Sequence, residues 1–198
     1  MMKEEKRVLR AFALGDGHIR VRGNSYSLSV SHCEKQKEYI IFKADMLSKI
    51  IGKKVEVHPY DNKGFPSYRF EVANEYFRFL RKWLYCNGNK TINLSYLRKL
   101  SHQGVAIWYM DDGSLVAKRR NGKIHAYDLT ISTYCSEKEA MNCISFFNER
   151  YGVTFTLKRN KGRFSIRCGT KEAKKLLEII TPYIHKSMIY KTFQTASI

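Results

Sequence analysis

The sequence Gly104-Val-Ala-Ile-Trp-Tyr-Met-Asp-Asp-Gly113 decides the fold, because an apolar run typical of a helix ends there in two carboxylates and a glycine. A similar stretch near the start, Val8-Leu-Arg-Ala-Phe-Ala-Leu-Gly-Asp-Gly17, also ends in Asp-Gly. Asp16 and Asp112 are 96 residues apart in a chain of 198. This spacing indicates two copies of one unit, each with a carboxylate at the C-terminal end of a helix.

A carboxylate at the C-terminal end of a helix is poorly placed for stability, because the helix dipole puts partial negative charge there. A single Asp-Gly is also an ordinary helix stop. Two of them at half-chain spacing favour a function, and a cation held between the two helix ends would remove the electrostatic conflict. In the first helix, small Ala11 and Gly15 lie one turn apart, which would let another helix approach closely.

The composition indicates a folded protein with a polyanionic partner. Hydrophobic residues make up 43% of the chain, and 36 Lys and Arg against 18 Asp and Glu give a net charge of +18. The basic residues are spread over the whole length and alternate with apolar ones at strand spacing, which favours nucleic acid over a membrane surface. No apolar run is long enough for a membrane span. We therefore expect a soluble, intracellular protein that binds no membrane. The five cysteines contain no Cys-x-x-Cys pair, so neither a disulfide framework nor a cysteine zinc site is indicated.

The hydrophobic periodicity predicts the same order of elements in both halves. The first half is predicted as helix 4–16, strands 18–22 and 25–31, helix 34–51, strands 54–59 and 67–72, and helix 74–85. After the short connection 86–90 and a helix over 93–101, the second half is predicted as the apolar helix, strands 114–118 and 127–133, helix 136–151, strands 154–160 and 163–168, and helix 170–181. We therefore predict an α+β fold of two pseudo-symmetric αββαββα repeats, residues 1–88 and 89–198, packed as one body.

The predicted strand pairs have an apolar back and a basic, hydroxyl-rich front. In the last hairpin Phe155, Leu157, Phe164 and Ile166 share one face, and basic and hydroxyl side chains share the other. Such a front suits double-stranded DNA, whose major groove admits a two-stranded ribbon. The residues predicted to bind DNA are His18, Arg20, Arg22, Ser25, Ser27, Ser29, His58, Arg69, Lys118, Arg120, Asp128, Thr130, Thr156, Lys158, Arg163, Ser165 and Arg167.

Over nearly its whole length the chain resembles the LAGLIDADG homing endonucleases in their monomeric, two-repeat form. The nine-residue motif falls on Leu9-Arg-Ala-Phe-Ala-Leu-Gly-Asp-Gly17 and on Val105-Ala-Ile-Trp-Tyr-Met-Asp-Asp-Gly113. The resemblance implies that the motif helices pack at a central axis, that two antiparallel sheets form a saddle over DNA, and that the protein acts as a monomer. It implies site-specific hydrolysis of both strands of a long asymmetric target with Mg²⁺ or Mn²⁺.

The resemblance also implies roles for particular residues. Asp16 and Asp112 would bind the metal, and the preceding residues, Gly15 and Asp111, are assigned to the same metal site. Lys90 and Lys186, again 96 residues apart, would lie close to the scissile phosphates. His32 and Thr133 stand at the end of each half's second strand, where the family often has a polar residue that orients water. The predicted catalytic residues are therefore Asp16, Asp112, Lys90, Lys186, His32 and Thr133.

Three other functions remain open at this point. The chain could be a maturase that binds its host intron RNA, or a DNA-binding regulator that does not cleave. A regulator of this kind would be expected to lose one or both motif acids, and this chain has both. A basic structural protein such as a ribosomal component is the third, and the paired helix-end acids argue against it.

Overall fold

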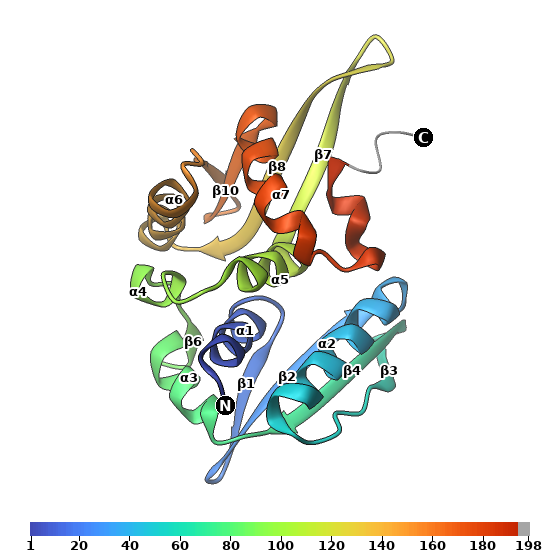
Figure 1. The fold of residues 1–198 in the computed structure, drawn as a ribbon, viewed down its shortest axis with the longest axis vertical. Coiled ribbons are helices and arrows are strands. Elements are labelled where there is room, and N and C mark those ends of the chain that lie inside the picture. The colour runs from blue at the N-terminus through green and yellow to red at the C-terminus, as the bar shows by residue number, and fades with distance from the viewer. Residues whose placement is uncertain (194–198) are drawn as a thin grey trace.

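The two motif helices, α1 (Lys3–Leu14) and α5 (His102–Asp112), lie side by side at the centre of the computed structural model (Figure 1). The structure describes residues 1–193. Ser101 caps the start of helix α5, its side chain accepting a hydrogen bond from the Gly104 amide, and every residue from Gly104 to Met110 is buried. A helix that is apolar on all sides belongs inside a core. The helices approach closely, since a Cβ added to Gly104 would lie 3.5 Å from the Cβ of Ala11.

Two four-stranded antiparallel sheets continue from these helices with the same topology. The first runs in the order β1 (His18–Arg22), β2 (Ser25–Cys33), β4 (Phe65–Ala73), β3 (His58–Asn62). The second runs in the order β7 (Gly113–Arg120), β8 (Lys123–Cys135), β10 (Arg163–Gly169), β9 (Thr156–Asn160). The α+β fold with two antiparallel sheets is confirmed.

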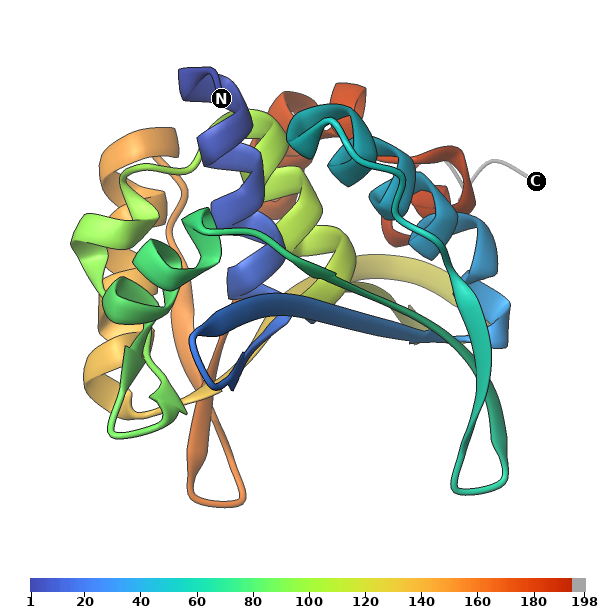
Figure 2. The same ribbon diagram turned by 90° about the horizontal axis from the view of Figure 1, so that it is seen from below.

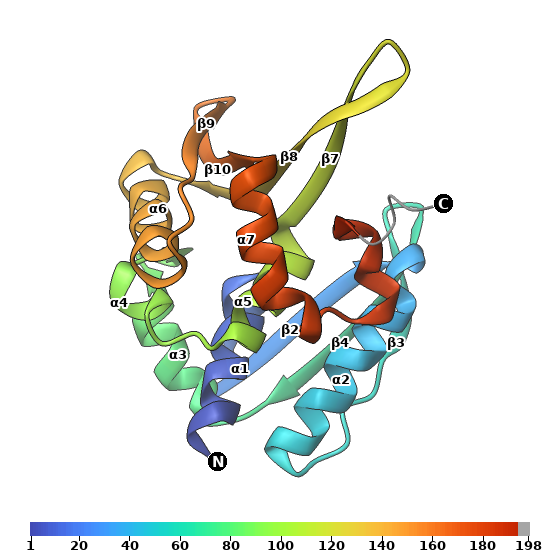
Figure 3. The ribbon, with the colours of Figure 1, turned by 45° about the horizontal axis from the view of Figure 1, so that its top comes forward.

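The other helices cover one side of the sheets. Helix α2 (Lys37–Ile51) packs on β2 and β4, while α6 (Glu137–Tyr151) and α7 (Thr170–Ile180) pack on β10 and β8 (Figure 3). Helix α3 (Tyr76–Leu84) and the short α4 (Leu94–Leu97) lie beside the motif helices. Three short 3₁₀ helices complete the described helices: η1 (Glu34–Gln36), η2 (Thr181–Tyr183) and η3 (Lys186–Lys191).

The helices and the sheets lie on opposite sides of the molecule. Figure 2 shows the strands arching below the helices, with the β3–β4 and β9–β10 hairpins projecting away from them. The buried apolar residues form one continuous cluster that includes both motif helices and both sheets. The outer faces of the sheets are therefore left as one curved surface on the side away from the core.

The structure differs from the predicted elements in several places. Strand β3 begins at His58, so residues 54–57 are not a strand as predicted. The predicted connection 86–90 holds part of a small hairpin, β5 (Tyr85–Cys86) with β6 (Asn89–Lys90). Strands β7 and β8 extend past the predicted strand ends at Lys118 and Tyr127, because only Asn121 and Gly122, both at positive φ, are needed to reverse the chain. Residues 194–198 of the predicted second repeat lie outside the described residues.

Among residues 1–193 we find no helix with the length and apolar character needed to cross a bilayer.

Candidate active site and nucleic-acid interface

Both motif acids lie where a central helix gives way to the first strand of its sheet. Asp16 follows the last turn of α1, and Asp112 is the last residue of α5. The glycine after each acid is required by close backbone approach, because a Cβ on Gly17 would collide with the Phe12 carbonyl and one on Gly113 with Tyr109. The motif therefore sets each carboxylate at a junction of helix and sheet close to the central axis.

The environment of the two acids disfavours their charge. Burial, followed by the negative charge of Asp111, raises the pKa of Asp16 to about 6 and that of Asp112 to about 7. The Asp112 carboxylate accepts a hydrogen bond from the indole N–H of Trp108 at 3.0 Å. Carboxylates gathered in this way are stabilised in their charged form by a cation.

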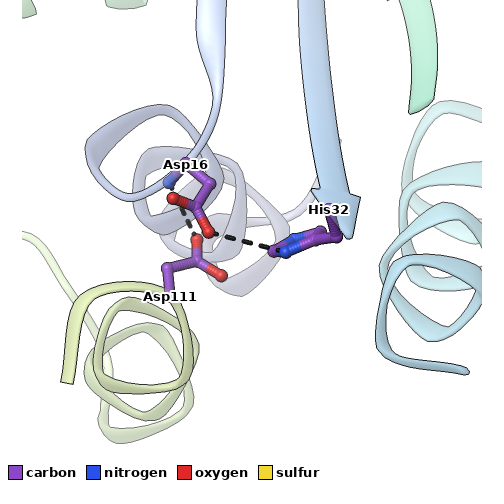
Figure 4. Close-up of side chains that lie close together, drawn as sticks. All are labelled: Asp16, His32 and Asp111. Carbon is purple, nitrogen blue, oxygen red and sulfur yellow. Dashed lines mark hydrogen bonds and ion pairs between the residues drawn. The ribbon is translucent and has the colours of Figure 1, made fainter. Parts of the chain in front are cut away.

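Asp111 is held differently from its two neighbours. Its side chain is 0% exposed and makes an ion pair with Lys43, which is also 0% exposed, at 2.8 Å. It also accepts hydrogen bonds from the Tyr39 hydroxyl at 2.8 Å and from the Asp16 backbone amide at 3.1 Å (Figure 4). Burial is the largest single influence and would raise the pKa of Asp111. The Lys43 charge, the nearby His32 and the hydrogen bonds from Lys43 and Tyr39 together outweigh burial, so the pKa is lowered. Asp111 is therefore a buried, paired carboxylate.

His32 lies beside Asp16 in the first half. Its Nδ1 is 3.6 Å from an Asp16 carboxylate oxygen and 2.9 Å from the Gln36 side-chain oxygen, and its Nε2 is 3.4 Å from the Lys43 ammonium. Burial, followed by the Lys43 charge, lowers the pKa of His32 to about 4. The ring is neutral at pH 7, and these partners assign its proton to Nδ1, toward Gln36. His32 thus lies beside the acid, whereas the Thr133 hydroxyl donates to the Phe164 carbonyl within its own sheet.

A lysine binds the end of each motif helix, partly buried in the first half and buried in the second. The Lys90 ammonium donates to the carbonyls of Gly15 and Gly17 at 2.8 and 2.7 Å. At the end of α5 the lysine that donates to the Met110 carbonyl is Lys191. Burial lowers the pKa of both lysines. Lys186, predicted for this place, is exposed at the start of η3. The 96-residue spacing fails here because the 3₁₀ helices after α7 lengthen the path, so the equivalent lysine comes 101 residues after Lys90.

The oxygen donors at the helix ends fit a hard divalent cation. Ligand atoms of Asp16, His32 and Asp111 lie within 4.8 Å of one another. However, both Asp111 oxygens already accept from Lys43, and the Gly15 carbonyl accepts from Lys90, so these two residues of the predicted metal site have their oxygens engaged. Asp16 and Asp112 have raised pKa values and keep unpaired carboxylate oxygens in the described interactions. An all-oxygen donor set suits Mg²⁺ or Mn²⁺.

The outer face of the first sheet gathers the predicted basic and hydroxyl residues. The register sets Arg20 opposite Ser27 and Arg22 opposite Ser25, and sets Arg69 opposite both Ser31 and His58. Opposed residues in a sheet point to the same side. Glu71 belongs to the same face and binds Arg20 at 3.1 Å, Arg22 at 3.8 Å and the Ser27 hydroxyl at 2.7 Å. Glu71 was not predicted for this face from the sequence, although its position between buried Phe70 and Val72 in the strand indicates that its side chain points outward.

The outer face of the second sheet has a similar arrangement. Asp128 makes ion pairs with Lys118 at 3.1 Å and Arg167 at 3.9 Å. The register places Arg167 opposite Thr156 and Ser165 opposite Lys158. Each sheet thus carries one acid that holds two basic side chains on an otherwise basic face.

Of the residues predicted to bind DNA, twelve are exposed on these faces, three are buried and two are partly buried. The side chains of Ser27, Thr130 and Ser165 are buried, with 8%, 7% and 3% of the residue exposed. Ser29 and Asp128 are partly buried. The exposed set is His18, Arg20, Arg22, Ser25, His58, Arg69, Lys118, Arg120, Thr156, Lys158, Arg163 and Arg167.

Lys43 is a second residue that the sequence interpretation missed. It lies one helical turn from Tyr39 and from Leu47, on the buried side of α2. A lysine in an apolar stripe signals a buried partner, because an unpaired ammonium is costly to bury.

Solved structures of related fold agree with this architecture. A structure described as the homing endonuclease I-WcaI bound to its DNA recognition sequence matches 96% of this chain and 86% of its own, with a TM-score of 0.80 and 21% identity. An I-DmoI variant in complex with its target DNA and Mn matches 93% of this chain and 98% of its own, with a TM-score of 0.56 and 14% identity. At these identities the likeness shows the fold alone.

Curated relatives include intron-encoded endonucleases and longer proteins. A probable intron-encoded DNA endonuclease 3 of Mycosarcoma maydis is 34% identical over 104 residues, covering 52% of this chain and 71% of that protein. A Protein RecA of Mycolicibacterium flavescens is 25% identical over 199 residues, covering 95% of this chain and 46% of that protein. The chain spans about half the length of the RecA proteins that it matches.

The family comparison covers both nine-residue motifs and both sheets. The sequence model described as the LAGLIDADG DNA endonuclease family matches residues 8–176, which include both helix-end acids and Lys90. The chain therefore belongs to the LAGLIDADG DNA endonuclease family.

Proposed function

We propose that this protein is a divalent-metal-dependent endonuclease that cleaves both strands of a long, asymmetric double-stranded DNA site. The observation that carries the proposal is the pairing of Asp16 and Asp112 at the ends of two adjacent helices, each with a lysine bound to the carbonyls of its helix end. Both acids have raised pKa values, which indicates that a cation would stabilise the site. The basic outer faces of the sheets flank this site.

In this proposal Asp16 and Asp112 hold Mg²⁺ or Mn²⁺. The metal supplies the means to activate water and to neutralise charge on the phosphate oxygens. Lys90 and Lys191 add fixed positive charge close to the same helix ends, where it can stabilise charge that develops on the phosphate. Neutral His32 carries its proton on Nδ1, 3.6 Å from an Asp16 oxygen, and can donate a hydrogen bond to water beside that acid. Thr133 and Lys186 receive no role, because the structure directs Thr133 into its sheet and leaves Lys186 exposed.

The two sheets would read opposite halves of the target. Arg20, Arg22 and Arg69 contact one half, while Lys118, Lys158 and Arg167 contact the other. The faces differ in sequence, so an asymmetric site is expected. Both acids come from one chain, which makes the site complete in a monomer, and we propose residues 1–88 and 89–198 as the two repeats.

The test begins with a randomised-site DNA library incubated with Mg²⁺, from which cleaved ends are recovered to give the target. On that target, Asp16→Asn and Asp112→Asn should each abolish double-strand cleavage while DNA binding survives. Asp45→Asn, at an exposed position of α2, is the matched control and should cleave normally. Cleavage retained by both motif variants would remove the mechanism, and binding of structured RNA without DNA cleavage would favour the intron-binding alternative.

A further inference from the structure

The two motif copies differ at the residue before the acid, and the difference is structural. The first copy has Gly15 and the second has Asp111. A Cβ added to Gly15 would collide with the Asp111 carboxylate. The Asp111 side chain therefore occupies the space that Gly15 leaves open, and it crosses from the second motif helix to the first.

Asp111 reaches the backbone that carries Asp16. Its Oδ2 accepts from the Asp16 amide at 3.1 Å, as Figure 4 shows. The same peptide unit contains the Gly15 carbonyl, which accepts from Lys90 at 2.8 Å. Because a peptide unit is planar, contacts on its N–H and on its C=O together fix its orientation. This orientation sets the direction in which the Asp16 side chain leaves the backbone.

Asp111 is in turn held from the first half. Lys43 donates to both of its oxygens, at 2.8 and 2.9 Å, and Tyr39 donates to one of them at 2.8 Å. With the Asp16 amide, these donors use most of the acceptor sites of a carboxylate. No equivalent contact from Gly15 to Asp112 is possible, because glycine has no side chain, and Asp112 is instead held through its carboxylate by Trp108.

We propose that Asp111 is a positioning residue for Asp16, and that Lys43 is the counter-ion that keeps Asp111 in place. The proposal rests on the proposed role of Asp16 as a metal ligand. It gives the two acids different dependence on their surroundings: the Asp16 side of the site depends on Asp111 and Lys43, and the Asp112 side does not.

The test compares two double variants that both remove the ion pair. Lys43→Met with Asp111→Asn keeps a side-chain oxygen that can accept from the Asp16 amide. Lys43→Met with Asp111→Leu has a similar outline but no acceptor. Replacing both partners avoids leaving a buried charge unpaired, which is the damaging case. Melting temperatures identify any general loss of stability.

The readout is binding of Tb³⁺, a hard cation whose luminescence can be excited through Trp108, next to Asp112. The Asn double variant should bind Tb³⁺ with an affinity close to that of the wild type. The Leu double variant should bind about tenfold more weakly, the loss expected when a charge-assisted hydrogen bond no longer positions a ligand. Equal affinities of the two double variants would overturn the proposal. If the Leu variant is unfolded by circular dichroism, the double variant Lys43→Met with Asp111→Ala takes its place with the same expectation.

A second measurement needs no metal. In the wild type the Asp16 amide should exchange its hydrogen at least about tenfold more slowly than the amide of Asn24 in the exposed β1–β2 turn, because it is bound to a buried carboxylate. In the Asn double variant this protection should remain, and in the Leu double variant it should disappear. Equal Asp16 exchange in the wild type and the Leu variant would overturn the proposal. A wild type that binds no Tb³⁺, although its Asp16 amide is protected, would instead show that the proposed metal site fails.

Discussion

Replacement of Asp112 by Asn should make the metal-free protein more stable. Burial and the Asp111 charge hold the pKa of Asp112 at about 7, against an ordinary 3.8. Since one pKa unit corresponds to about 1.4 kcal/mol, the charged carboxylate lowers the free energy of unfolding by up to about 4 kcal/mol at pH 8. Asn keeps an oxygen that can accept from Trp108 and carries no charge. For a chain of this size the gain corresponds to a rise in Tm of about 10 °C.

The sign of the pH dependence follows from the raised pKa. Between about pH 4 and pH 7 the folded protein retains a proton on Asp112 that the unfolded chain releases. The contribution of Asp112 to the stability of the metal-free wild type should therefore fall as the pH rises through this range and level off above it. The Tm advantage of Asp112→Asn should be largest near pH 8 and close to zero near pH 4. Asp16→Asn should show a smaller effect, because the Asp16 side chain is 37% exposed and solvent screens its charge.

Thermal melts in EDTA from pH 4 to pH 8 measure this difference, with Asp45→Asn as the control. Added Mg²⁺ should raise the Tm of the wild type at pH 8, because a ligand of the folded state stabilises it, and should raise that of Asp112→Asn much less. A Tm of Asp112→Asn equal to or below that of the wild type at pH 8 would refute the reasoning that an uncompensated charge is stored at this helix end.

Three further predictions follow from the packing and the charged faces. Gly15→Ala alone should lower the free energy of unfolding by about 1–3 kcal/mol, because the added methyl overpacks against Asp111. Thermal melts should show a smaller loss when Lys43→Met and Asp111→Ala are also present. Additive effects would mean that the contact between Gly15 and Asp111 is absent. If the sheets neutralise about six phosphates, DNA affinity measured by fluorescence anisotropy should drop on the order of 10³-fold between 50 and 200 mM salt, and a flat response would exclude this mode of binding. Glu71→Gln frees Arg20 and Arg22 and should relax base preference in one half-site, as a profiled cleavage library would show. Asp128→Asn should relax base preference in the other half-site. Changes spread over the whole site would contradict the proposal that each sheet reads one half.

The sequence was most informative where a pattern is local. Alternating strands and apolar helical stripes predicted most elements to within a few residues, because each pattern reflects which side of one element is buried. The two Asp-Gly helix ends predicted where the acids lie, since a helix that stops at a glycine places the preceding side chain at its end. Strand β3 was misplaced, because residues 54–57 alternate like a strand but have no partner strand in the described sheet.

The sequence by itself therefore determined the two-fold pattern, the family resemblance, the basic sheet faces and the identity of the helix-end acids. Only the tertiary structure decided which distant groups meet those acids. Lys191 replaces Lys186 because loop length sets which lysine reaches the end of α5. The buried contact of Lys43 with Asp111 joins α2 to α5 through two residues that are 68 positions apart in the sequence. Such contacts depend on how helices and loops pack in three dimensions. A buried charge is tolerated only where that packing places an opposite charge beside it. No local sequence pattern could therefore specify the pair of Lys43 and Asp111.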